Sequence, residues 1–298
     1  MRAVAVALCL TLVPAVGFAQ GVLPQGTSFV ANVEGEWRLY VVEPIGRRLR
    51  HVLTASEPRT PAYDPGRRRV AYVAADGAVR EIDLATGRDV VLANPTDELA
   101  YTQLNPGSAH LPDSWIAVGL KQGASVDTDL YRLGSASPAP LLTQRSAQFE
   151  PSVSADGFLY YSNVHCVVAC GRPIAEIWRM HLVSRQVMQL VRTNAMSREP
   201  VASPDGRWVY FSSDADGWFH LWRADAETGA LERLTAGEHN DVAPAVASDN
   251  TVYFIRRGTT GGRLFRRDPG GRIGPVDIGV PAKDVRDLKI AINAEKPQ

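Results

Sequence analysis

Charged side chains recur just before a set of prolines that is spread along the chain. Glu150 precedes Pro151, and Arg198 and Glu199 precede Pro200. Carboxylates serve as general acids, general bases or cation ligands, and arginine makes bidentate bonds to carboxylate or phosphate groups. If the fold gathers these stretches, they form a mixed ring of charge that would bind a small ligand, a cation or a peptide.

The complete set of candidate residues shares a position at or next to the start of an expected strand. The set consists of Arg59, Glu150, Arg198, Glu199, His239, Asp241 and Arg286. In an enzyme, the arginines would clamp a substrate carboxylate and His239 would be the general base. The alternative is that the same charged residues form ion pairs that close the site, and the sequence leaves both interpretations open.

The sequence contains no motif of a known catalytic class. G-x-S-x-G, H-E-x-x-H and a phosphate-binding glycine loop are all missing, and the six histidines are widely dispersed. Asp214 and Asp216 in "SSDADGW" have the spacing of cation ligands, but the bidentate carboxylate of a calcium loop is missing, which favours an ordinary turn. We therefore expect no cofactor, with a structural or channel-bound cation as the remaining option.

Internal repeats provide the elements that would position these residues. "EPSVSADGFLYYSN" (150–163) matches "EPVASPDGRWVYFSS" (199–213), and "APAVASDNTVYFIRR" (243–257) and "TPAYDPGRRRVAYVAADG" (60–77) match both. Pro151 and Pro200 are 49 residues apart, Pro200 and Pro244 are 44 apart, and Pro61 lies 90 residues, or two periods, before Pro151. Each copy reads as short alternating strands separated by turns, so the period predicts four-stranded antiparallel units.

The ends of the chain are expected to complete the same architecture. "TSFVAN", "WRLYVVEP" and "LRHVLT" read as the second, third and fourth strands of a unit that lacks its first strand. "KDVRDLKIAINA" (283–294) lies one period after Pro244 and would supply that strand. The sequence therefore predicts an all-β, six-bladed propeller, closed by the C-terminal strand, with the first strand of each blade lining a central channel.

The repeat also resembles a known family. The pattern P-x-x-S-P-D-G, with Y-F-S, D-G, L-W, T-G and L-T at later positions, is similar to the WD40-like PD40 repeat of TolB-like β-propellers. It is carried here by Pro200, Ser203–Gly206, Phe211, Ser213, Gly217, Leu221, Trp222, Asp225, Gly229, Leu234 and Thr235. The resemblance implies a binding scaffold, a gating domain of a peptidase or a sugar-acid lyase. We expect the propeller to stand without the N-terminal α/β domain of TolB.

The first residues predict export. "MRAVAVALCLTLVPAVGFAQ" has a basic start, an apolar centre and a small-x-small cleavage site, which is typical of a signal peptide over residues 1–19. Residues 20–298 would then form one propeller in the periplasm or outside the cell. In that oxidising compartment we expect Cys166 and Cys170 to form a disulfide, while a metal site that combines them with His165 lacks a fourth ligand.

Charge and hydropathy limit the classes of partner. The formal net charge is zero, which disfavours nucleic acid, and no apolar run beyond the leader is long enough to span a membrane. We expect a monomer that binds a protein or peptide in the cell envelope without catalysing a reaction, and Trp218, in a turn, is a candidate contact residue. The alternative is a propeller enzyme, a lyase or hydrolase of polyanionic sugars, with its site at the channel mouth.

Overall fold

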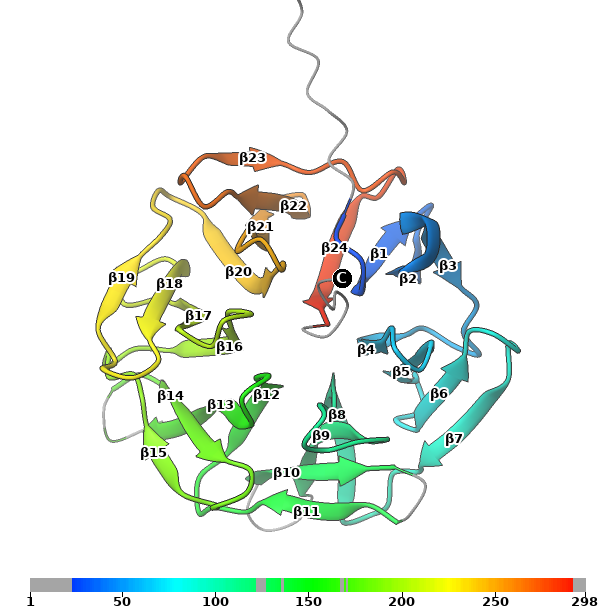
Figure 1. Cartoon of the computed structure of the whole chain (residues 1–298), viewed down its shortest axis with the longest axis horizontal. Helices are drawn as coiled ribbons and strands as arrows, with labels where there is room; N and C mark the ends of the chain where they lie inside the picture. The colour runs from blue at the N-terminus through cyan, green and yellow to red at the C-terminus, as the bar shows by residue number, and fades with distance from the viewer. Residues whose placement is uncertain (1–22, 122–126, 135–136, 167–168, 170, 292–298) are drawn as a thin grey trace, which may run out of the picture.

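The computed structural model describes residues 23–121, 127–134, 137–166, 169 and 171–291. These residues form six four-stranded antiparallel sheets that are arranged as blades around a central channel (Figure 1). The signal peptide predicted over residues 1–19 and Cys170 of the predicted disulfide lie outside the described residues. No helix in the described part of the chain is long and apolar enough to cross a membrane.

Each blade is a sheet whose four strands follow one another from the channel to the outside of the ring. The first blade is completed by the last strand of the chain. Blade 1 consists of β24 (Asp284–Ile290), β1 (Thr27–Val33), β2 (Glu36–Val42) and β3 (Leu49–Val52), with the 3-10 turn η1 (Ile45–Arg47). Blades 2 and 3 consist of β4 (Arg59–Asp64), β5 (Arg69–Val73), β6 (Val79–Asp83), β7 (Asp89–Ala93), β8 (Leu99–Pro106), β9 (Trp115–Lys121), β10 (Asp127–Leu133) and β11 (Ala139–Leu142).

The remaining blades follow the same order from the channel to the rim. Blades 4, 5 and 6 consist of β12 (Gln148–Val153), β13 (Phe158–Cys166), β14 (Ile174–His181), β15 (Val187–Gln189), β16 (Ser197–Ala202), β17 (Trp208–Ser213), β18 (His220–Asp225), β19 (Leu231–Arg233), β20 (Asn240–Val246), β21 (Val252–Gly258), β22 (Gly261–Arg267) and β23 (Ile273–Pro275). The predicted all-β, six-bladed propeller and its closure are confirmed, because β24 pairs antiparallel with β1.

The hydrophobic core is divided among the interfaces between adjacent blades. Six clusters of buried residues lie one at each interface, for example Tyr63 and Tyr72 packed against Val30 and Leu39 between blades 1 and 2. The middle strands are therefore buried on both faces, as the consecutive buried residues of β5 and β21 show. Trp178 and Trp222 pack at the edges of two clusters, at equivalent positions of blades 4 and 5.

All six innermost strands contain a β-bulge, where two residues oppose one on the partner strand. In five of them the first bulge residue has a positive φ: Thr60 (43°), Glu150 (54°), Glu199 (58°), Ala243 (53°) and Asp287 (57°). Positive φ is uncommon outside glycine, so its recurrence at equivalent positions shows that the bulge is a regular structural feature of the blades. The bulge frees the N–H of its first residue from the ladder within the blade.

Candidate functional site

The innermost strands enclose a cavity of about 530 Å³ that follows the channel. We call the mouth at which these strands begin the start mouth, and the other the end mouth. The cavity wall includes the bulge residues Thr60, Glu150, Glu199, Ala243 and Asp287. Thus the residues just before the repeat prolines do converge from distant parts of the chain, as the repeat pattern predicted.

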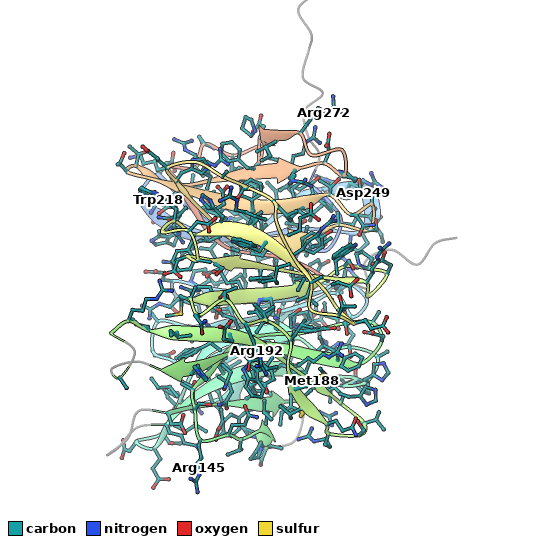
Figure 2. All side chains as sticks on the ribbon, turned by 90° about the vertical axis from the view of Figure 1, so that its left-hand side faces the viewer. Arg145, Met188, Arg192, Trp218, Asp249 and Arg272 are labelled. Carbon is teal, nitrogen blue, oxygen red and sulfur yellow. The ribbon has the colours of Figure 1, made fainter. Side chains whose placement is uncertain are left out.

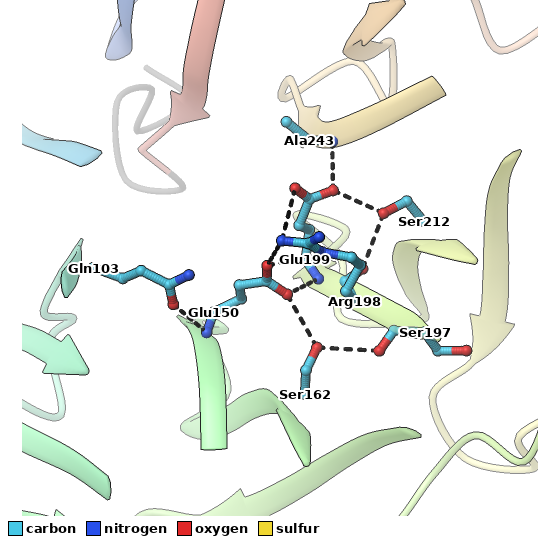
Figure 3. A network of polar contacts seen from close by, with 8 residues as sticks. All are labelled: Gln103, Glu150, Ser162, Ser197, Arg198, Glu199, Ser212 and Ala243. Atoms are coloured by element: carbon cyan, nitrogen blue, oxygen red, sulfur yellow. Dashed lines mark hydrogen bonds and ion pairs between the residues drawn. The ribbon is translucent and has the colours of Figure 1, made fainter. Parts of the chain in front are cut away.

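The carboxylate of Glu150 is the centre of a polar network that joins blades 4 and 5 (Figure 3). One oxygen accepts bonds from the Arg198 guanidinium, with 3.0 Å from Nε, and the other accepts from the Glu199 N–H at 2.8 Å and the Ser162 hydroxyl at 3.2 Å. Burial raises the pKa of the Glu150 carboxyl, and Arg198 opposes that rise. The pair is therefore held inside the channel wall.

Glu199 repeats this arrangement one blade further on. Its carboxylate accepts bonds from the Ala243 N–H and from the Ser212 hydroxyl, both at 2.7 Å. The remaining contact of Glu199 is with Arg198, at 3.9 Å between Nη2 and Oε1.

A bond from a bulge N–H to a side-chain oxygen of the preceding blade also links other neighbouring blades around the channel. The Asp287 carboxylate accepts the Thr60 N–H at 3.1 Å, and the Gln103 side-chain oxygen accepts the Glu150 N–H at 2.7 Å. Together with Glu150 and Glu199, these residues supply four links in which a side chain of one blade bonds the freed bulge N–H of the next. An unpaired buried N–H is costly, so the acidic residues before the prolines have a structural reason to be there.

The other predicted site residues lie at the start mouth but outside the wall of the cavity. Arg59 is exposed, and Arg286 bonds Glu57 at 2.8 Å and lies 3.9 Å over the Trp37 ring. Asp241 is fully buried and held by both nitrogens of Arg256, at 2.7 and 2.9 Å.

His239, the suggested general base, faces Asp241 rather than the cavity. Its Nε2 lies 3.5 Å from Asp241 Oδ2, and its ring lies 6.3 Å from the buried ring of His220. Burial lowers the pKa of His220, and Asp241 opposes that change. Among the described residues, no three His, Cys, Asp or Glu side chains are placed to hold a metal ion. The carboxylates of Asp214 and Asp216 are also bonded within the protein, because Asp214 accepts the Met196 N–H and Asp216 forms an ion pair with Arg233.

Three side chains of the cavity wall escaped the sequence analysis. Phe219, which follows the exposed Trp218 in the sequence, and Arg257 lie at the start mouth, and Lys289 lies deeper in the channel. Lys289 carried a readable signal: strand register places it level with Ala62, Leu104, Ser152, Val201 and Ala245, so five blades have an uncharged residue where the sixth has lysine. Phe219 and Arg257 gave no such signal, because they come from loops and strand ends.

Comparison with known proteins identifies the type of propeller. No family model matches the chain. A stretch of 128 residues is 28% identical to the uncharacterized protein Atu1656 of Agrobacterium fabrum, and the match spans 42% of either chain. A TolB structure from Agrobacterium tumefaciens matches at 18% identity over 84% of this chain and 87% of that one, with a TM-score of 0.64. The chain has the TolB-like six-bladed propeller fold.

Further solved structures show how widely this fold is used. TolB from Acinetobacter baumannii matches at 18% identity and a TM-score of 0.66, and the match covers 88% of this chain and 65% of the Acinetobacter chain. A puromycin-hydrolyzing peptidase of Mycobacterium tuberculosis matches at 15% identity and a TM-score of 0.60, over 87% of this chain and 47% of the peptidase chain. An oligogalacturonate lyase in complex with manganese matches at 12% identity and a TM-score of 0.60, over 84% of this chain and 73% of the lyase chain. Because TolB proteins, a peptidase and a lyase share the architecture, function must be argued from the site.

Proposed function

We propose that this TolB-like propeller is an exported, non-catalytic scaffold that binds a protein or peptide segment in the cell envelope at its start mouth. The observation that carries the proposal is the state of the charged ring. Glu150, Arg198, Glu199 and Asp287 bond one another or the backbone of the next blade, so they form a rigid rim rather than a set of free catalytic groups.

Contact groups remain available around this rim. Trp218 is 43% exposed, Arg257 is exposed, and Phe219 and Asn240 lie beside them in the cavity wall. Aromatic side chains and an arginine at the same mouth of the channel have the composition typical of binding hot spots. A peptide end or loop would place an apolar side chain against Phe219 and Trp218, and an acidic or carbonyl group against Arg257.

The enzyme alternative has less support in the geometry. A lyase or hydrolase of polyanionic sugars at the start mouth would need a free base, and His239 points to a carboxylate already taken by Arg256. The ring arginine Arg198 is likewise bonded to Glu150. The likeness to an oligogalacturonate lyase supports the fold of such an enzyme but not these roles.

Site-specific photo-crosslinking in envelope extracts would test the proposal. A crosslinker at Trp218 or Arg257 is expected to capture the same partner, while one at Asp249, in a turn on the opposite side of the disc, or at Met188, on the outer rim, should not (Figure 2). Trp218→Ala with Arg257→Glu should weaken binding of the captured partner about 100-fold, since two hot-spot contacts contribute roughly 3 kcal/mol. Equal capture from Met188 or Asp249 would contradict a start-mouth site.

A further inference from the structure

The innermost strands present backbone acceptors to the channel at the repeat prolines. Proline has no N–H, so its carbonyl is the only backbone polar group that it offers. The Pro61 carbonyl accepts a bond from Lys289 Nζ at 2.9 Å, and the Pro151 carbonyl accepts a bond from a side-chain amide of blade 3. Pro200 and Pro244 occupy the same place in their bulges and line the same cavity, so their carbonyls point in the same direction.

Lys289 shows which chemical group these carbonyls bind. Its Nζ donates to the Leu104 carbonyl at 2.6 Å and the Pro61 carbonyl at 2.9 Å, with a longer contact of 3.5 Å to the Thr60 carbonyl. An ammonium group has three donors and no acceptor, and three carbonyls match this charged form. Lys289 therefore occupies the edges of blades 2 and 3 as a built-in alkylammonium ion.

Blades 5 and 6 present the same edge without a lysine. Strand register places Val201 and Ala245 level with Lys289, and both side chains are too short to reach across the channel. Within the described part of the chain, no side chain donates a hydrogen bond to the Pro200 or Pro244 carbonyl. These edges thus repeat the kind of acceptor that holds Lys289, and they leave it open to the cavity.

Carboxylates flank the open edges on both sides. Glu199 of blade 5 and Asp287 of blade 1 line the cavity, and blade 6 between them has Ala243 at the equivalent position. Among the described residues, the one contact of Glu199 Oε1 is with Arg198, at 3.9 Å, and no hydrogen bond reaches Asp287 Oδ1. Each carboxylate therefore keeps an oxygen that can accept a bond from a ligand.

The charge and size of the cavity also suit a cationic ligand. Between the two mouths, the described wall has three carboxylates and two cations: Glu150, Glu199, Asp287, Arg198 and Lys289. The interior therefore has an excess of one formal negative charge, which attracts a cation more strongly there than in water. The volume of about 530 Å³ falls in the size range of small-molecule sites.

We propose that blades 5, 6 and 1 form a binding site for a primary alkylammonium group in the channel. Its three N–H donors would bond the carbonyls of Pro200 and Pro244 and one of the flanking carboxylates, and its alkyl stem would lie against Val201 and Ala245. The group comes either from a free alkylamine or from a lysine of the proposed partner. The site lies deeper than the start-mouth contacts and does not rest on the proposed partner binding.

Ligand-observed NMR titrations of the wild-type protein with n-butylamine, which is protonated at pH 7, would test the proposal. Two matched probes separate the contributions: butyltrimethylammonium keeps the charge but has no N–H donor, and 1-butanol keeps the stem but has no charge. Because hydrogen bonds of a charged group change affinity by about tenfold or more each, both probes should bind at least about 30-fold more weakly. Binding of either probe as tight as that of butylammonium would overturn the proposal.

Conservative variants locate the site. Glu199→Gln and Asp287→Asn remove a charge but keep an oxygen for the N–H of the next blade, and each should weaken butylammonium binding about tenfold. Glu232→Gln, on the outer strands of blade 5, should leave binding unchanged. Lys289→Ala frees the carbonyls of blades 2 and 3, so this variant should bind two butylammonium ions instead of one. Unchanged affinity in both channel carboxylate variants, or one ion bound by Lys289→Ala, would contradict the proposal.

A peptide-like probe distinguishes the two sources of the ammonium group. Tighter binding of Nα-acetyl-lysine methylamide than of butylamine, with the gain lost in Trp218→Ala, would assign the site to a lysine of the partner. Equal affinity of the two probes would assign it to a free alkylamine. Failure of both probes to bind would overturn this site without contradicting crosslinks at the start mouth, and loss of those crosslinks would leave the butylammonium titration unaffected.

Discussion

Removing Glu150 should destabilise the propeller far more than removing an exposed acidic residue with a similar ion pair. The Glu150 carboxylate accepts bonds from Arg198, the Glu199 N–H and Ser162. Glu150→Met therefore leaves the Glu199 N–H without its acceptor, and it leaves the Arg198 guanidinium with the longer contact of 3.9 Å to Glu199. Breaking a buried pair in this way costs about 3–5 kcal/mol. Because the Arg198 side chain keeps 42% exposure and can turn towards water, we expect a loss of about 3 kcal/mol.

A matched control exists on the outer strands of blade 5. Arg223 bonds Glu232 through Nε at 2.8 Å and Nη2 at 2.5 Å, but Glu232 is 48% exposed. Glu232→Met should therefore cost less than about 1 kcal/mol. Guanidinium denaturation of both variants gives the comparison, and thermal unfolding should show a fall of roughly 6 °C for Glu150→Met.

Double-mutant cycles separate the ion pair from the other bonds. The sum of the losses for Glu150→Met and Arg198→Met should exceed the loss of the double variant by about 2 kcal/mol, because the pair couples through a buried contact. The cycle for Glu232 and Arg223 should give about 0.5 kcal/mol. Equal coupling in the two cycles, or a Glu150→Met variant as stable as Glu232→Met, would refute the view that the ring is a set of buried links between blades.

Three further predictions concern single buried groups and use urea denaturation as the measurement. Between about pH 8 and 10.4 an unfolded chain binds more protons at Lys289 than the folded one, so wild-type stability should rise relative to Lys289→Met by at most about 3 kcal/mol, and a fall would contradict the lowered pKa. The lowered pKa of His220 means that below about pH 6.5 the unfolded chain takes up a proton at this residue before the folded chain does. Acidification towards pH 5 should therefore destabilise wild type more than His220→Gln. The same dependence of unfolding free energy on pH in both proteins would contradict the lowered pKa. Asp241→Ala should cost about 3–5 kcal/mol because it leaves Arg256 unpaired, whereas the exposed Asp249→Ala should cost less than 1 kcal/mol.

The repeat pattern was sufficient to predict the blades because each blade is a local structure. Turn residues such as those of Ser203–Gly206 and the alternating apolar residues after them specify four strands within about 45 residues. The displaced first strand could be predicted too, since a unit that begins on its second strand at Thr27 needs a partner from elsewhere. The convergence of the residues before the prolines followed from that architecture.

The bonds that those residues make could not be predicted, because they depend on contacts between blades. The sequence shows Glu150, Glu199 and Asp287 as equivalent acidic or charged positions, but the bulge that frees an N–H in the next blade is a feature of the folded strand. His239 shows the same limit: it precedes an innermost strand, yet packing turns it towards Asp241 instead of the cavity. Arg257 and Phe219, which come from blades 6 and 5, come together in the cavity wall only when the ring has folded.

The sequence by itself therefore determined the class, number and order of the strands, and the place where the ring closes, since these depend on local turns and on a fixed period. Only the tertiary structure decided which charged groups bond one another and which face the cavity. Lys289 shows the reason most clearly. Its position in the repeat is visible in the sequence, but the bonds from its Nζ to the carbonyls of Pro61 and Leu104 form only once blades 1, 2 and 3 surround the channel.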